Sequence, residues 1–399
     1  MTSAARIRSR RIGVSLVFFA NGAVFASWVP HIPGVAGRLH LGEAALGLAL
    51  LCLAAGAMAS LSAAGKLIGR FGSRLVTRVA GVVFCLALPL PILAPSPITL
   101  GLSLALFGMA NGAMDVAMND QAVMVERAKG SPVMSSFHGL FSLGGLAGAA
   151  LGGMVLAAGV APWVHALGAT AVLGLVCAAG LMRLVPSPPE GAGAGKSPFA
   201  LPDRRVLPLC LLALLTLACE GAMADWTSVY LSGDLGAGPG LAASGYAAFS
   251  LAMAAGRFAG DRLTAALGPA RLARFSALLA CAGLVAAVAA PWPLLAAGGF
   301  ALTGLGLSNL IPLLFSAAGR TPGVAPGQAI AGTASAGYLG FLIGPPIIGF
   351  TAGLTSLRVS LAGLALCAGL TAALSRLLDR PEAEGGKEAS GETEAEEYS

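Results

Sequence analysis

Long apolar stretches separated by short polar ones run through the whole chain. A bilayer core of roughly 30 Å needs about 20 apolar residues per helix. Stretches of this length predict twelve membrane-spanning helices. Their approximate ranges are 11–33, 44–66, 75–95, 97–125, 133–159, 162–184, 205–231, 241–265, 271–290, 293–318, 327–352 and 357–378.

The predicted helices fall into two halves that repeat one another. A segment rich in Pro, Gly and Ser, 186–204, separates the sixth span from the seventh and reads as a linker. Trp28 and Trp226, and likewise Asn111 and Asn309, are 198 residues apart. We therefore expect an all-α membrane protein with two pseudo-symmetric six-helix bundles and a site between them. The expected parts are bundles 1–185 and 205–380, the cytoplasmic linker 186–204 and a disordered acidic tail 381–399.

Composition excludes a soluble protein, because 56% of the residues are hydrophobic and only 11% are charged. The seven cysteines lie inside apolar runs without metal-ligand spacing, so we expect free thiols and no metal site. The net charge of +6 combines an acidic tail with a basic excess in residues 1–380, and this excess belongs to loops, which argues against nucleic-acid binding. The lipid bilayer is the expected surrounding, and we expect a monomer.

Lys and Arg are distributed very unevenly between the two sides of the predicted membrane. If the N-terminus is cytoplasmic, all of the 24 Lys and Arg residues except Arg38 and Arg358 fall on the cytoplasmic side. Cytoplasmic loops of membrane proteins carry such an excess. The pattern predicts that both termini are cytoplasmic.

One predicted span carries polar residues at helical spacing. Asn111, Asp115 and Asn119 recur every four residues in the fourth span, so a helix places them on one face. A carboxylate inside a membrane is costly and usually functional. We interpret this face as the wall of a polar cavity.

Two further stretches carry a family resemblance. Gly256-Arg-Phe-Ala-Gly-Asp-Arg262-Leu263 closely resembles the loop motif of the major facilitator superfamily, and Gly65–Arg74 resembles it less closely, with Gly69 in place of Asp. The implied gating residues are Gly65, Arg70, Arg74, Gly256, Arg257, Asp261 and Arg262. We expect Asp261 to accept hydrogen bonds at the start of the fifth span, near Ser131–Met134, because a helix N-terminus attracts a carboxylate.

Other segments resemble the bacterial YbjJ-like branch of this superfamily, namely Asn111–Glu126, Phe137–Gly148 and Tyr338–Gly349. That branch is similar to the fucose permease group, whose fourth span has a carboxylate followed four residues later by Asn, as at Asp115 and Asn119. The acidic residue of that group's first span has no counterpart here, where Asn21 is the strong polar group. The resemblance implies a multi-pass protein of the bacterial inner membrane.

In this superfamily the first, fourth, seventh and tenth spans line the cavity, and these spans hold the polar residues of this chain. The predicted substrate-binding residues are Asn21, Trp28, Asn111, Asp115, Asn119, Glu220, Trp226, Asn309 and Tyr338. Asp115, Glu220 and His138 are the candidates for proton coupling. Asp225 lies about 140° around the helix from Glu220, and we assign it to a gate between the bundles.

The leading functional hypothesis is a secondary active transporter that carries a small polar solute, with a sugar as one candidate, together with a proton. An alternative is a proton-coupled antiporter that exports a drug or metabolite. Gly144–Gly153 resembles the antiporter motif, with Ala149 in place of Pro, although spacing at 144, 148 and 152 also fits helix packing. A membrane sensor is a distant alternative. We expect no enzyme activity and no cofactor besides the coupling proton, because neither a phosphate-binding loop nor a catalytic constellation occurs in the sequence.

Overall fold

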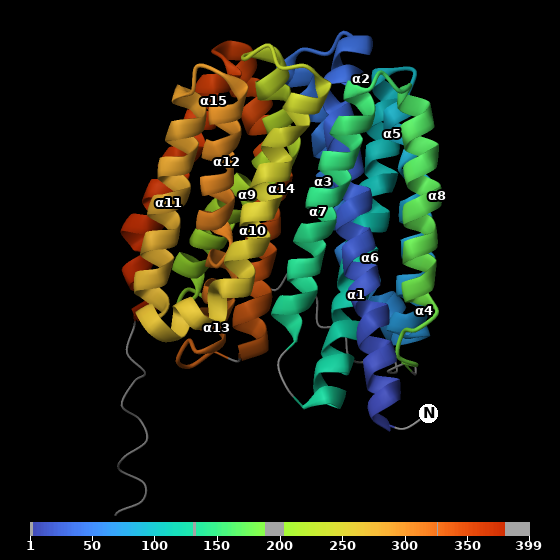
Figure 1. Ribbon diagram of the computed structural model, residues 1–399. Coiled ribbons are helices and arrows are strands. Elements are labelled where there is room, and N and C mark those ends of the chain that lie inside the picture. The colour runs from blue at the N-terminus through green and yellow to red at the C-terminus, as the bar shows by residue number, and fades with distance from the viewer. Residues whose placement is uncertain (1–2, 131–132, 188–202, 325, 380–399) are drawn as a thin grey trace, which may run out of the picture.

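The chain is built from long helices that cross the molecule from one end to the other (Figure 1). The computed structural model describes residues 3–130, 133–187, 203–324 and 326–379. Most of the predicted linker 186–204 and the predicted tail 381–399 therefore lie outside the described residues. Within the described ranges the chain contains helices and their connections, with no strand. We call the end that carries the N-terminus the lower end and the opposite one the upper end, as in Figure 1.

Each half of the chain supplies one bundle. The first half contains α1 (Ser3–Trp28), η1 (Val29–His31), α2 (Ile32–Arg38), α3 (Glu43–Phe71), α4 (Ser73–Ala87), α5 (Pro89–Leu93), α6 (Pro97–Lys129), α7 (Met134–Ala157) and α8 (Pro162–Leu181). The second contains α9 (Leu207–Gly233), α10 (Pro239–Leu267), α11 (Pro269–Ala289), α12 (Pro293–Leu307), α13 (Leu310–Gly319), α14 (Pro326–Leu354), α15 (Leu357–Leu374) and η2 (Ser375–Asp379).

The helix ends follow from local sequence. Proline is the first residue of α6, α8, α10, α11 and α12, where its missing N–H costs nothing. Ser96 also caps α6, because its hydroxyl accepts from the Thr99 amide at 3.3 Å. The third and tenth predicted spans are each broken into two helices, α4–α5 and α12–α13.

Eleven segments of the described chain are long and apolar enough to cross a membrane. The eighth predicted span, 241–265, is the one that is not among them, although it forms the 29-residue helix α10. Its lower half carries Arg257 and Arg262, and its upper half carries Ser244, Tyr246 and Ser250. These side chains lower the mean hydropathy of a helix that packs mainly against protein.

The same packing occurs in both halves, as the sequence repeat predicts. α1 packs on α7 as α9 packs on α14, and α3 packs on α6 as α10 packs on α12. The turns α3–α4 and α10–α11 each pivot on one glycine in the left-handed region, Gly72 (φ 79°) and Gly268 (φ 77°). The two bundles therefore share the same arrangement of helices.

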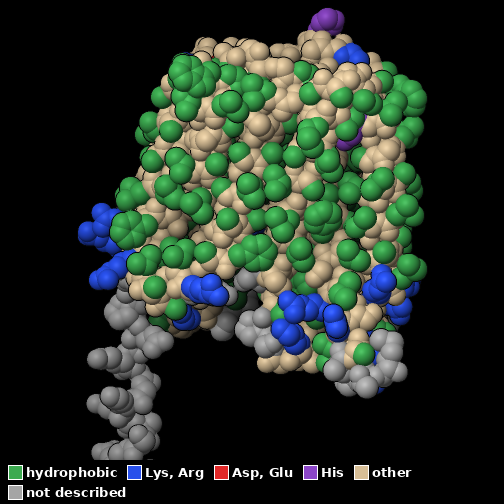
Figure 2. Space-filling model, in the orientation of Figure 1, with side chains coloured by type: hydrophobic (Ala, Val, Ile, Leu, Met, Phe, Trp, Pro, Cys, Tyr) green, Lys and Arg blue, Asp and Glu red, His purple; other side chains and the backbone are tan. Residues whose placement is uncertain are grey.

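The bundles meet through two helix pairs, α7 with α10 and α3 with α14. Gly47 of α3 lies against Pro345 of α14 near the upper end, and Gly153 of α7 lies against Ala243 of α10. In Figure 1 the two halves diverge toward the lower end, and the surface in Figure 2 is notched between them there. The molecule is thus closed at the upper end.

The glycines of α7 have a packing role. A side chain at Gly144 would strike the Phe19 carbonyl of α1, and one at Gly148 would strike the Ala23 carbonyl. Close backbone approach of this kind is the common use of small residues in membrane helices. It accounts for the spacing that also resembles an antiporter motif.

Candidate functional site

Asp115 of α6 accepts hydrogen bonds from both bundles. Asn119, one turn along α6, donates its Nδ2 to the Asp115 backbone oxygen at 2.9 Å and to Oδ1 at 3.2 Å. Tyr338 of α14, in the other bundle, donates its hydroxyl to Oδ2 at 3.3 Å. No Lys, Arg or His of the described chain pairs with this carboxyl. The predicted residues Asn119 and Tyr338 therefore meet at Asp115, and both are neutral donors.

Asn111, one turn above Asp115, contacts a different predicted residue. Its Oδ1 accepts from Asn21 Nδ2 of α1 at 3.0 Å, and Asn21 is 1% exposed. The amide pair holds α1 against α6 inside the first bundle. Asn111 is half-buried and retains its own amide donors, so it can still serve a solute.

Glu220 of α9 is neutralised by Arg257 of α10. Arg257 Nη2 lies 3.1 Å from Glu220 Oε1, with side-chain exposures of 15% and 18%. Arg257 Nη1 also donates to Ser142 Oγ of α7 at 3.0 Å, which links the second bundle to the first. Arg257 therefore contacts an acid of the neighbouring helix inside the second bundle. Its long side chain turns inward to Glu220 instead of staying at the lower surface.

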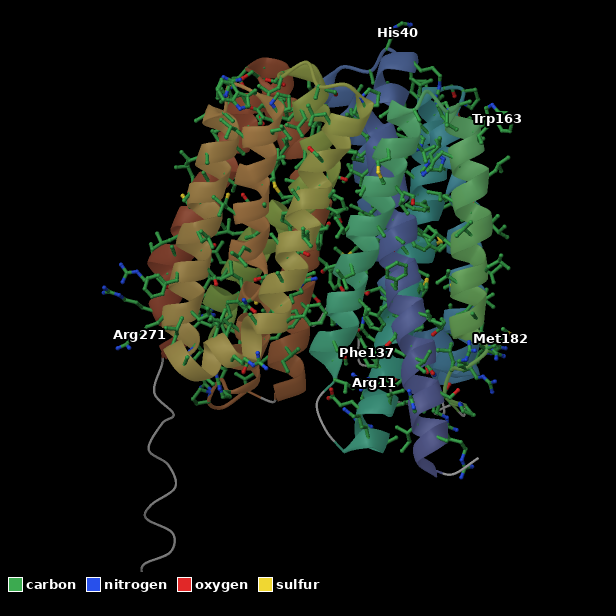
Figure 3. All side chains as sticks on the ribbon, viewed as in Figure 1. Arg11, His40, Phe137, Trp163, Met182 and Arg271 are labelled. Atoms are coloured by element: carbon green, nitrogen blue, oxygen red, sulfur yellow. The ribbon has the colours of Figure 1, made fainter. Side chains whose placement is uncertain are left out.

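His138 of α7, a candidate for proton coupling, lies against aromatic rings of the first bundle. Its ring packs edge-on against Phe18 of α1, with centroids 5.3 Å apart. Its nearest charged neighbour is Arg257, which is within electrostatic reach. Phe137 beside it also stacks on Phe18, at the lower end of α7 in Figure 3. His138 is thus a neighbour of the Glu220–Arg257 pair.

Three predicted substrate-binding residues are buried away from any solute in this conformation. Trp28 and Trp226 are 1% and 0% exposed, and neither indole N–H finds a partner in the described chain. Asn309 lies in the break between α12 and α13 and donates to the Gly256 carbonyl at 3.3 Å. The tenth predicted span bends at this break, and the Asn309 amide fastens it to α10.

The remaining gating residues that the structure describes lie near the lower end, on the side that carries most Lys and Arg residues. Gly65, Arg70 and Arg262 are exposed, and the Arg74 amide donates to Ser187 Oγ at 2.8 Å. The side chain of Asp261 lies outside the described residues.

The start of α7, the expected partner of Asp261, is occupied by another carboxylate. Glu126 Oε2 of α6 accepts from the Val133 amide at 2.8 Å and the Met134 amide at 3.0 Å. Because the side chain of Asp261 lies outside the described residues, a contact of Asp261 with this helix end stays a prediction. Glu126 is close in sequence and reaches the helix N-terminus from within the same bundle.

Sequence analysis missed a buried histidine pair near the upper end. His31 Nε2 lies 2.7 Å from His165 Nδ1, and the rings stack with centroids 4.9 Å apart. His31 also lines a cavity of about 400 Å³ between the bundles, together with Pro30, Arg38, Leu156, Ser232 and Ala242. The two histidines are 134 residues apart in sequence, so no local pattern pointed to the pair. The described chain holds no group of three or more metal-ligating side chains.

Comparisons with known proteins agree with this architecture. The family model of the Major Facilitator Superfamily matches residues 14–322 and again 209–396. An MFS-type transporter of Yersinia pestis is 38% identical over 376 residues, which is 93% of this chain and 96% of that protein. The solved D-xylose–proton symporter superposes with a TM-score of 0.73 at 15% identity, covering 96% of this chain and 99% of that one. The fucose:proton symporter of E. coli superposes with a TM-score of 0.60 at 15% identity, covering 94% and 100%. At such identities the solved structures show the fold alone.

Proposed function

Because the chain belongs to the major facilitator superfamily, whose members are membrane transporters, we propose that it carries a small polar solute together with a proton. The two bundles rock about the site between them and open it alternately to each side. Sugars are the leading solute class, since Asp115 and Asn119 match the carboxylate and Asn of the fucose permease group. The energy comes from the proton gradient, and the protein acts as a monomer in the inner membrane.

The observation that supports proton coupling is the hydrogen bonding of Asp115. A carboxyl that is surrounded by amide and hydroxyl donors, without a cation, can exist in either protonation state. Its Oδ2 is bonded to Tyr338 of the opposite bundle. Adding a proton to this oxygen would turn it into a donor, so the hydrogen bond between the bundles would have to reverse its direction. Protonation and rocking are thereby linked through one hydrogen bond.

Glu220 is a weaker candidate for coupling than the sequence indicated, because Arg257 already compensates its charge. We assign the pair to positioning, since it fixes α9 against α10 and reaches α7 through Ser142. The solute would then contact Asp115, Asn119 and Asn111 from one bundle and Tyr338 from the other.

The distribution of basic residues supports a cytoplasmic lower end. Figure 2 shows Lys and Arg gathered around that end, and Figure 3 places Arg11 and Arg271 there and His40 at the upper end. By the positive-inside rule the conformation described here is open toward the cytoplasm. Cysteines introduced beside Arg74 and Arg262 should react with a membrane-impermeant maleimide only from inside. Cysteines beside Arg38 and Asp234 should react from outside, and the opposite pattern would invert the topology.

The experiment for function has two stages. Purified protein is first screened by thermal shift against sugars, amino acids and nucleosides, because a ligand that binds the folded state raises its stability. The best ligand is then used for uptake into proteoliposomes driven by a pH gradient. Asp115→Asn should abolish gradient-driven uptake while ligand-induced stabilisation persists. Asp120→Asn, on the same helix, is the matched control and should transport normally. Wild-type gradient-driven uptake by Asp115→Asn would remove Asp115 from the coupling step.

A further inference from the structure

Asp225 of α9 is a buried acid with no hydrogen bond or ion pair within the described chain. It is 8% exposed, in contrast to Asp234, which lies exposed just beyond the upper end of the same helix. Asp115 accepts hydrogen bonds and Glu220 is ion-paired, so Asp225 differs from both. The transport mechanism described above makes no use of it.

Most of the charged and titratable side chains on the elements packed around α9 contact other groups. Arg257 binds Glu220, His31 binds His165, and Tyr338 binds Asp115. Arg38 donates to the carbonyls of Ile92 and Ala94, Arg358 lies within electrostatic reach of Tyr230 and Asp234, and Arg262 lies exposed near the lower end of α10. Tyr246 of α10 is the titratable neighbour within electrostatic reach, and it bonds to Ser250. An ionised carboxylate at Asp225 would therefore lie uncompensated in an apolar interior, which is very costly.

Asp225 also lies on the face of α9 that meets the other bundle. Residues three apart share a helix face, which places Ser228 beside it. Ser228 Oγ donates to the Val29 carbonyl of η1, in the first bundle, at 3.1 Å. The same face is covered at the upper end by α2 and η1. Separation of the bundles at that end would expose Asp225 to water.

We propose that Asp225 is a second proton-binding carboxyl of the transport cycle, protonated while the upper end is closed and free to ionise when that end opens. The proposal rests on the transport function proposed above but not on Asp115. An ionised Asp225 cannot be re-buried without cost, so the upper end closes readily only after the acid has taken up a proton from the outer side. The acid thereby makes closure depend on proton binding.

Infrared difference spectroscopy tests the protonation state directly and needs no substrate. Spectra of the wild type in lipid at neutral pH should contain the carbonyl stretch of a protonated carboxylic acid that is missing from Asp225→Asn. Asp234→Asn, which removes an exposed acid from the same helix, should leave that band intact. If the wild-type and Asp225→Asn spectra agree in this region, Asp225 is ionised and the proposal is wrong.

A second experiment tests the link to opening. Spin labels at Gly34→Cys of α2 and Ala237→Cys of the α9–α10 connection lie on opposite bundles beside the upper cavity. Raising the pH should increase the population with a long interlabel distance, and Asp225→Asn should abolish this increase. Protein with only its native cysteines corrects for background labelling. An undiminished pH response in Asp225→Asn overturns the proposal. If Asp115→Asn loses the response while Asp225→Asn keeps it, the response belongs to Asp115. Asp225→Glu, which keeps a carboxyl at this position, should restore the response, and size-exclusion chromatography checks that the Asn variant is folded.

Discussion

Replacing either Glu220 or Arg257 alone should lower the free energy of unfolding strongly, because the two side chains form a buried ion pair. Both side chains are less than one-fifth exposed, so water screens their attraction poorly. Replacing Glu220 with Gln keeps a side-chain oxygen that can accept from Arg257 but removes the negative charge that balances the guanidinium. Breaking a buried pair in this way costs about 3–5 kcal/mol, because a charge remains buried without compensation.

The double substitution should behave differently from either single one. Glu220→Gln with Arg257→Met removes both charges and fills a similar volume, and such replacements are often neutral or stabilising. We expect Glu220→Gln and Arg257→Met each to lower the free energy of unfolding by roughly 3 kcal/mol or more. The double variant should recover most of this loss. The resulting coupling energy would be well above the deviation from additivity of about 0.5 kcal/mol that independent sites show.

The assay is reversible unfolding of the purified protein by titration with a denaturing detergent, followed by tryptophan fluorescence. Ser142→Ala supplies an internal comparison. It removes one interbundle hydrogen bond, and hydrogen bonds between membrane helices average about 0.6 kcal/mol. If Glu220→Gln costs no more than Ser142→Ala, the pair carries no buried charge, and its assignment to positioning fails. Strictly additive single and double variants would have the same consequence.

Three further predictions concern packing and helix ends. Glu126→Gln should speed hydrogen exchange at the two backbone amides that begin α7, since the carboxylate contributes about 0.3–1 kcal/mol at a helix N-terminus. Gly148→Leu should abolish the folded monodisperse protein, because overpacking costs about 1–3 kcal/mol or more, whereas Gly168→Leu, with open space around it, should be tolerated. His165→Ala should lower thermal stability by leaving a buried imidazole unpaired, at about 1–3 kcal/mol, and the exposed His40→Ala should not.

The fold was predictable because the bilayer imposes it. Hydrophobic length, the charge bias and the repeat spacing together give the helix count and the two halves. The break at Asn309 lies just before Pro312, which lacks the backbone N–H that a continuous helix would use there. Hydropathy was least informative for α10, whose upper half packs polar side chains such as Tyr246 and Ser250 against other helices. A helix that packs against protein does not need the high hydropathy of a helix that faces lipid.

The site was predictable only where one helix determines it. Spacing of four residues places Asn119 beside Asp115, and the structure has that contact. Spacing cannot say which neighbour a side chain reaches, and Asn111 turns to Asn21 instead. Arg257 illustrates the same limit, because a long side chain can carry its charge several ångströms from its backbone position. A sequence motif locates the backbone of such a residue and not its guanidinium.

Three acids lie inside the membrane-spanning region near the bundle interface, and each is accommodated differently. Glu220 has a permanent cation within its own bundle, so rocking of the bundles leaves its charge compensated. Asp115 depends on Tyr338, which belongs to the other bundle, and Asp225 depends on closure by η1 and α2. The environments of Asp115 and Asp225 must therefore change when the bundles move, while that of Glu220 need not. A coupling proton requires a group whose affinity for it differs between conformations. That requirement selects Asp115 and Asp225, one in each bundle, over the ion-paired Glu220.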